Sequence, residues 1–198
     1  MKEAMFYDKL EDRSVRCGLC PHRCVIEEDK RGICAVRENR GGILHSLVYG
    51  RAVSCAIDPI EKKPLFHFYP GSEAYSIATV GCNLRCRNCQ NYEISQMPRE
   101  TGRIEGVDIP PERIVEEAHS AKCRSIAYTY TEPTIFFEYA YDTAIIASKR
   151  GIKNLFHTNG YITEQALKEI APYLDAANVD LKSMREEFYR ENCGARLQ

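Results

Sequence analysis

The chain has 198 residues, and its 27 lysines and arginines against 28 aspartates and glutamates give a formal net charge of −1 at pH 7. This balance gives no general reason to expect a nucleic-acid or membrane partner. No secretory leader and no run of about 18 apolar residues is visible, so we expect a cytoplasmic protein. Between residues 13 and 51, eight basic residues face four acidic ones. A solvated basic face is the first interpretation, with an anionic substrate or RNA as the second.

The first expected unit, residues 1–72, is a small cysteine-rich β-hairpin module. Four thiols follow the spacing C-x2-C-x3-C-x9-C, which predicts a metal site because a reducing cytoplasm disfavours disulfides. Structural zinc and an auxiliary iron–sulfur cluster are both open, with four unmetallated thiols as the remaining alternative. A bound metal would stabilise so small a core. The candidate ligands are Cys17, Cys20, Cys24 and Cys34.

Within this unit, strands are predicted at 33–38 and 43–49, with a turn at 39–42. Residues 50–72 are expected to form a proline-punctuated connector that lies over the next unit. His22 is expected to be solvated, with a role as a replacement ligand as the alternative. Three further cysteines lie outside the cysteine motifs, and we expect them to be buried apolar side chains. They are Cys55, Cys123 and Cys193. Cys55 could instead be an extra metal ligand.

The second expected unit, residues 73–198, alternates strands and helices. Strands are predicted at 75–80, 125–131, 154–158 and 177–181, and helices at 111–123, 134–150 and 163–170, with a further element beginning at 184–192. Pro111 suits a first helical turn, Gly151 ends the second helix, and Thr163 is expected to cap the third. Repeated βα units with short connections predict a parallel sheet, either open or closed into a barrel.

A loop with three thiols follows the first of these strands. Residues 81–90 read GCNLRCRNCQ, which places the thiols at C-x3-C-x2-C. A structural zinc ion and an iron–sulfur cube normally take four protein ligands, so three thiols are one short. The spacing therefore indicates a cube with one iron left free for chemistry, ligated by Cys82, Cys86 and Cys89.

The loop resembles the cluster-binding loop of the radical S-adenosylmethionine (SAM) enzymes. The chain as a whole, including DPIEKKPLFHF at 58–68, resembles the AmmeMemoRadiSam-system radical SAM enzymes, which are similar to the pyruvate formate-lyase activating enzyme. The resemblance implies a 4Fe-4S cluster whose fourth iron is chelated by SAM. It also implies reductive cleavage to a 5′-deoxyadenosyl radical that abstracts hydrogen from an unidentified substrate, with a reductant such as flavodoxin or ferredoxin. The implied fold is a partial (β/α) barrel, because relatives build further C-terminal units.

Polar residues of this unit fall at the carboxyl ends of the predicted strands, where α/β barrels gather their active sites. Glu132 can accept from the ammonium of SAM, Lys182 can pair with its carboxylate, and Asp180 or Asn159 can bond ribose hydroxyls. The resemblance implies similar roles, although His157 replaces an acid and the glycines that precede Glu132 in relatives are missing. A helix-start acid and an ordinary ion pair are the simpler alternatives. The candidate SAM-binding residues are Asn88, Gln90, Thr131, Glu132, Pro133, Asn159, Asp180 and Lys182.

Two other functions remain open. One is a glycyl-radical-enzyme activase, which the position of the cysteine module before the cluster loop argues against. The other, of a different class, is a non-catalytic interaction module in which zinc fills both cysteine groups.

Overall fold

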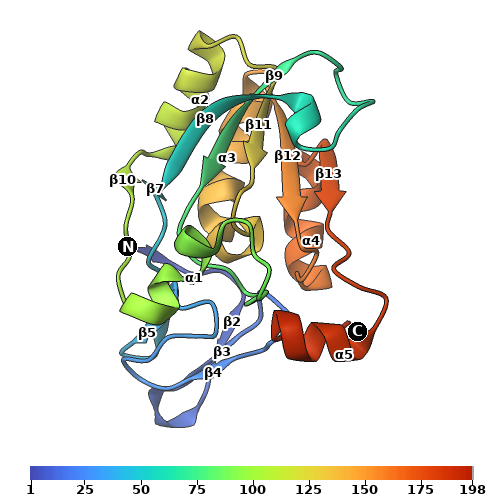
Figure 1. Ribbon diagram of the computed structural model, residues 1–198. Coiled ribbons are helices and arrows are strands. Elements are labelled where there is room, and N and C mark those ends of the chain that lie inside the picture. Colours follow the sequence, from blue (N-terminus) through green and yellow to red (C-terminus); the bar gives the residue numbers. More distant parts are fainter. Residues whose placement is uncertain (198) are drawn as a thin grey trace.

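A five-stranded sheet organises the molecule in the computed structural model, which describes residues 1–197 (Figure 1). The strand order is β13-β12-β11-β9-β8. Four of these strands are parallel to their neighbours, and β8 pairs antiparallel with β9 at one edge. The expected mixed α/β fold with a parallel sheet is therefore confirmed. The strands are β8 (Ser54–Pro59), β9 (Glu73–Ala78), β11 (Ser125–Tyr128), β12 (Lys153–Thr158) and β13 (Ala176–Val179).

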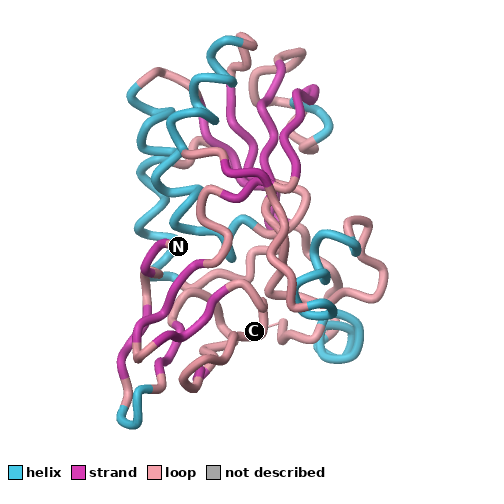
Figure 2. Tube along the Cα trace, turned by 90° about the vertical axis from the view of Figure 1, so that its left-hand side faces the viewer, coloured by secondary structure: helices cyan, strands magenta, loops and turns pink. Residues whose placement is uncertain are grey.

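A short 3-10 turn at Ile60–Lys62 packs against one face of this sheet, and three longer helices cover the other face (Figures 1 and 2). They are α2 (Pro111–Ser120), α3 (Phe137–Lys149) and α4 (Glu164–Ile170). Alternate strand residues point to opposite faces. Large apolar side chains such as Ile77 and Phe156 join the main core with the helices, whereas small ones such as Ala74 and Ala127 face the other side. Ile60, Leu65 and Phe68 from the segment after β8 pack against these small side chains.

The N-terminal strands lie near the carboxyl ends of the parallel strands (Figure 1). They form two small antiparallel sheets, and one hydrophobic cluster runs from Val15, Ile26 and Leu44 to helix residues such as Val115 and Phe137. Strand β7 (Arg51–Ala52) also pairs with β10 (Val107–Asp108). The two small sheets comprise β1 (Lys2–Glu3), β6 (Ile43–Ser46) and β5 (Arg37–Arg40), and β2 (Tyr7–Lys9), β3 (Val15–Cys17) and β4 (Val25–Ile26).

Short helical elements complete the described part of the chain. Four are 3-10 turns, one is a ten-residue helix that follows the cysteine loop, and two lie near the C-terminal end. They are η1 (Glu11–Arg13), η2 (Ile60–Lys62), α1 (Tyr92–Thr101), η3 (Pro133–Phe136), η4 (Ala171–Tyr173), α5 (Glu186–Phe188) and the π-helical η5 (Tyr189–Cys193). None of the helices in residues 1–197 has the length and apolar character that a membrane span requires.

The structure corrects the expected connector at 50–72. Residues 54–59 are not linker but form β8, which pairs along its whole length with β9. Cys55 on this edge strand is exposed, so its expected place in the core was wrong, whereas Cys123 and Cys193 are buried as expected. His22 is half-buried rather than solvated. The partner that defines β8 lies beyond a loop, so no local pattern marks this strand.

Several element boundaries also differ. The hairpin strand expected at 33–38 is β5 at 37–40, because two successive positive-φ glycines, Gly41 and Gly42, form the turn. Strand β11 ends at Tyr128, since Tyr130 takes a φ of 62°. The expected helix at 134–150 is divided into η3 and α3. Thr163 precedes α4 but does not cap it; its hydroxyl bonds the carbonyls of Gly18 and Leu19 instead.

Candidate active site

A cavity of about 510 Å³ lies at the carboxyl ends of the four parallel strands. This volume falls within the range of about 300–1,000 Å³ that small-molecule sites occupy. The cysteine loop after β9 contributes one side, and the segments that follow β11, β12 and β13 contribute the others. The lining includes Cys82, Cys86, Asn88, Cys89, Gln90, Thr131, Glu132, His157, Asn159, Asp180 and Lys182. Pro133 is buried in η3 and does not line the cavity.

The three loop thiols all line this cavity. Cys82 Sγ accepts from the Leu84 amide at 3.3 Å, and Cys89 Sγ shares a hydrogen bond of 3.3 Å with Ser95 Oγ. Within residues 1–197, no three His, Cys, Asp or Glu side chains stand close enough to hold a metal ion. The thiol chemistry, the shared cavity and the count of three fit a cube with one open iron.

Burial raises the pKa of two of these three thiols. It raises the pKa of Cys82 far above the usual thiol value. For Cys86, burial and then the neighbouring thiol of Cys193 raise the pKa to about 12. Cys193 lies in η5, so the C-terminal segment packs directly on the cysteine loop. The backbone confirms this contact, because Arg85 N donates to the Cys193 carbonyl at 2.8 Å.

Asn83 anchors the loop from within. Its side-chain Nδ2 donates to the Tyr161 carbonyl at 2.8 Å, and its Oδ1 accepts from Asn159 Nδ2 at 2.8 Å. His22 Nε2 bonds the Asn83 carbonyl, also at 2.8 Å. Gly81 completes the anchorage, because a Cβ at this position would lie 2.6 Å from Val36 Cγ1. Asn83 was not among the residues predicted from the sequence, and the available signal was its place between two candidate cysteine ligands.

Glu132 ties the end of β11 to the end of β12. Its Oε1 accepts from Thr134 N at 3.0 Å, Thr134 Oγ1 at 2.6 Å and Thr158 Oγ1 at 2.7 Å, while Oε2 accepts from Asn159 N at 2.8 Å. Burial raises the pKa of Glu132, and these hydrogen bonds partly offset the rise. The residue thus acts as the cap of η3, and Oε2 keeps room for one further donor.

Asp180, Lys182 and His157 form a second polar group on the rim. Asp180 Oδ1 lies 3.2 Å from His157 Nε2, and Oδ2 accepts from Lys182 Nζ at 2.8 Å. The hydrogen bond from His157, together with Lys182, lowers the pKa of Asp180 to about 2. Asn159 was expected to bond a ribose hydroxyl. In the structure, its side-chain amide bonds Asn83 and Tyr161 instead.

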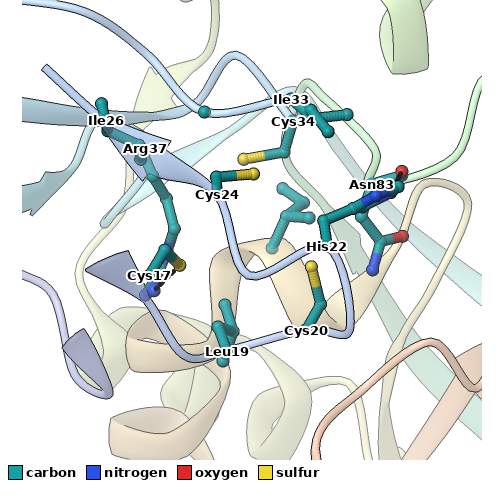
Figure 3. A pocket seen from close by; sticks show the side chains of 12 residues that line it. Cys17, Leu19, Cys20, His22, Cys24, Ile26, Ile33, Cys34, Arg37 and Asn83 are labelled. Atoms are coloured by element: carbon teal, nitrogen blue, oxygen red, sulfur yellow. Dashed lines mark hydrogen bonds between the residues drawn. The ribbon is translucent and has the colours of Figure 1, made fainter. Parts of the chain in front are cut away.

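The four N-terminal cysteines line a separate, smaller cavity of about 20 Å³ (Figure 3). Burial raises the pKa of Cys20 to about 12 and that of Cys34 to about 11. The buried guanidinium of Arg37 pairs with Glu138, and its Nη1 lies 3.8 Å from Cys17 Sγ. The space holds about one water-sized group. Asn83 also lines this cavity, so it separates the two groups of thiols.

The site places a three-cysteine loop, which follows the first parallel strand, at the carboxyl edge of a parallel sheet. This arrangement is typical of a class of enzymes. The family model of the radical SAM superfamily matches residues 76–197, and the chain belongs to this superfamily. Its members are enzymes that typically use a 4Fe-4S cluster and SAM, and a reductant is their usual partner. The chain is also 50% identical, over all of its 198 residues, to an uncharacterized protein of Methanocaldococcus jannaschii. It spans 58% of that relative's length.

Proposed function

We propose that the protein is a radical SAM enzyme of the AmmeMemoRadiSam type, in which Cys82, Cys86 and Cys89 hold a 4Fe-4S cluster. When bound, the cluster would supply the electron that splits SAM into methionine and a 5′-deoxyadenosyl radical, which abstracts hydrogen from a substrate. The observation that carries this proposal is the single cavity shared by the three thiols and the polar ends of the next three parallel strands. A loop of structural cysteines alone gives no reason for that convergence.

The residues around the cavity suit the parts of SAM. Lys182 donates one hydrogen bond, to Asp180, and retains further N–H groups for the SAM carboxylate. Glu132 Oε2 can accept from the SAM ammonium. Asn88 and Gln90 flank the third cysteine and face the cavity, which favours contacts with the adenine. We assign Asn159 the role of positioning the cysteine loop, because its side-chain amide bonds Asn83 within that loop.

The N-terminal cysteines we assign to a structural metal site, with zinc and a second iron–sulfur cluster as the two candidate occupants. The module contacts the cluster loop directly through His22 on Asn83. It also holds the start of α4, because the Leu19 carbonyl accepts from Thr163 N at 3.0 Å. We therefore propose that residues 1–72 hold the loop in place and that residues 73–198 form the catalytic unit.

Anaerobic reconstitution with iron and sulfide tests the proposal. The protein should become brown, bleach on reduction, and release 5′-deoxyadenosine and methionine from SAM, as measured by mass spectrometry. The Cys86→Ala variant should lose both products, and Cys55→Ser, which changes an exposed cysteine on β8, should keep them. A colourless protein with zinc in both cysteine groups would instead support a non-catalytic module.

A further inference from the structure

The face of the sheet opposite α2, α3 and α4 carries a polar group that the SAM site does not use. It comes from the end of β8 and from η2, at Asp58, Lys62 and Lys63, and it meets Tyr130 from the segment after β11. Both lysines and Tyr130 line the same cavity as the cysteine loop. Buried Ile60 anchors η2 against the small residues of this face. The lysines are therefore held by the fold beside the candidate active site.

Asp58 lies at the centre of this group. Its Oδ1 accepts from Lys62 Nζ at 2.6 Å, and its Oδ2 accepts from Lys63 Nζ at 2.6 Å and from Ser76 Oγ at 2.7 Å. The Tyr130 hydroxyl donates to Oδ2 as well. Burial alone would raise the pKa of Asp58, but these hydrogen bonds outweigh it and hold the pKa well below its usual value. The carboxylate is thus ionised at neutral pH.

Two ammonium groups share this single carboxylate. Lys63 is 1% exposed and Lys62 is 58% exposed at the side chain, so the buried lysine already balances Asp58 and Lys62 is left over. Each ammonium has three N–H donors, and within residues 1–197 each gives one to Asp58. Lys63 also lies 4.5 Å from the centre of the Tyr130 ring. The group therefore carries one excess positive charge at the cavity.

No acid elsewhere on the described cavity wall is free to balance that charge. Asp180 is paired with Lys182 and His157, and Glu132 is bonded within its own segment and to β12. Tyr130 separates the two ends of the cavity: its carbonyl accepts from Asn91 Nδ2 at 2.7 Å beside the cysteine loop, while its hydroxyl reaches Asp58. An anionic ligand at the lysine end would meet this excess positive charge.

We propose that Lys62, supported by Lys63 and Tyr130, forms a substrate subsite for an anionic oxygen group, either a carboxylate or a phosphate. The inference rests on the proposed function for its radical chemistry, since it names the class of molecule placed beside SAM. The binding of the anion itself needs neither the cluster nor SAM. Lys62 is the specificity residue, and Asp58 positions it.

Isothermal titration calorimetry of the reconstituted protein with inorganic phosphate and, separately, with malonate tests the subsite. At least one anion should bind saturably, and the stronger of the two distinguishes phosphate from carboxylate recognition. Loss of a charge-assisted hydrogen bond should weaken binding about tenfold or more in Lys62→Met. Lys62→Arg should restore it. Lys149→Met, which changes an exposed lysine at the end of α3, should bind like the wild type.

Equal anion affinity in Lys62→Met and wild type, or no saturable binding of either anion to the wild type, would overturn the subsite. A loss of SAM affinity in Lys62→Met would overturn it too, because the lysine would then belong to the SAM site. The two proposals fail separately. Wild-type protein that cleaves SAM without binding anions refutes the subsite alone, whereas lysine-dependent anion binding without SAM cleavage supports the subsite and refutes the proposed activity.

Discussion

Replacing Glu132 by glutamine tests the link between β11 and β12. The carboxylate is 1% exposed and accepts four hydrogen bonds from three residues. Glutamine keeps the size. If the glutamine oxygen occupies the Oε1 position, it can still accept from Thr134 and Thr158. The glutamine NH2 group then faces the Asn159 N–H, and two donors cannot bond each other. One buried N–H loses its partner, and the remaining bonds lose their charge.

A buried donor without an acceptor costs about 1–3 kcal/mol. Neutral hydrogen bonds are also weaker than charged ones by about 1 kcal/mol each, a loss that relief of the buried charge partly offsets. We expect Glu132→Gln to lose about 2 kcal/mol, which for a domain of this size lowers the Tm by about 4–8 °C. Glu132→Ala leaves all four donors without an acceptor and should lose more.

Thermal unfolding followed by far-UV circular dichroism, at matched metal content, measures this loss. Glu116→Gln, at an exposed position of α2, is the control and should unfold like the wild type. Asn159 connects Glu132 to Asn83, so the glutamine variant should also retain less iron after reconstitution. A Glu132→Gln protein with the wild-type Tm would refute the reasoning, because the hydrogen bonds would then contribute nothing.

Three further predictions concern the metal sites and the rim. Cys20→Ser should lose the metal of the N-terminal site and unfold at a lower temperature, because structural zinc contributes about 10–16 kcal/mol of apparent binding energy in small domains; metal analysis with thermal unfolding checks this, and a stable, metal-replete variant would contradict it. Asn83→Ala should reduce iron retention with little effect on zinc, since it removes two side-chain hydrogen bonds of the cluster loop; equal iron content in variant and wild type would count against the anchor. The pKa of Asp180 is lowered to about 2, so the stability from its ion pairs is complete above about pH 4 and is lost as the pH falls toward 2. Urea unfolding at pH 5 and at pH 2.5 should show a smaller acid loss for Asp180→Asn than for the wild type, and identical losses would disprove this linkage.

Local patterns explain which parts of the fold could be predicted. The four parallel strands and three helices follow from hydrophobic periodicity and from end signals such as Pro111 and Gly151. The helix α1 escaped prediction because Pro98 lies inside it and Asn91 makes no side-chain cap. Strand β8 escaped because its short edge sequence becomes a strand only through pairing with β9. Both misses reflect tertiary contacts that outweigh weak local preference.

The candidate site divides in the same way. Cysteine spacing and the positions of polar residues after each strand predicted which segments meet at the cavity. Every candidate SAM residue except Pro133 lines it, and the contacts of these residues with SAM stay a prediction. The partners within the site were not predictable. Asn83 bonds Asn159 across 76 positions, and Tyr130 reaches Asp58 across 72.

The sequence by itself determined the three-thiol loop, the βα order and the edge of the sheet where polar residues gather, because these depend on spacing over a few residues. Only the tertiary structure decided that Glu132 caps η3 and holds Asn159, that Cys193 touches Cys86, and that two lysines share one aspartate. Such contacts depend on the path of the whole chain, which brings together side chains that no short pattern connects.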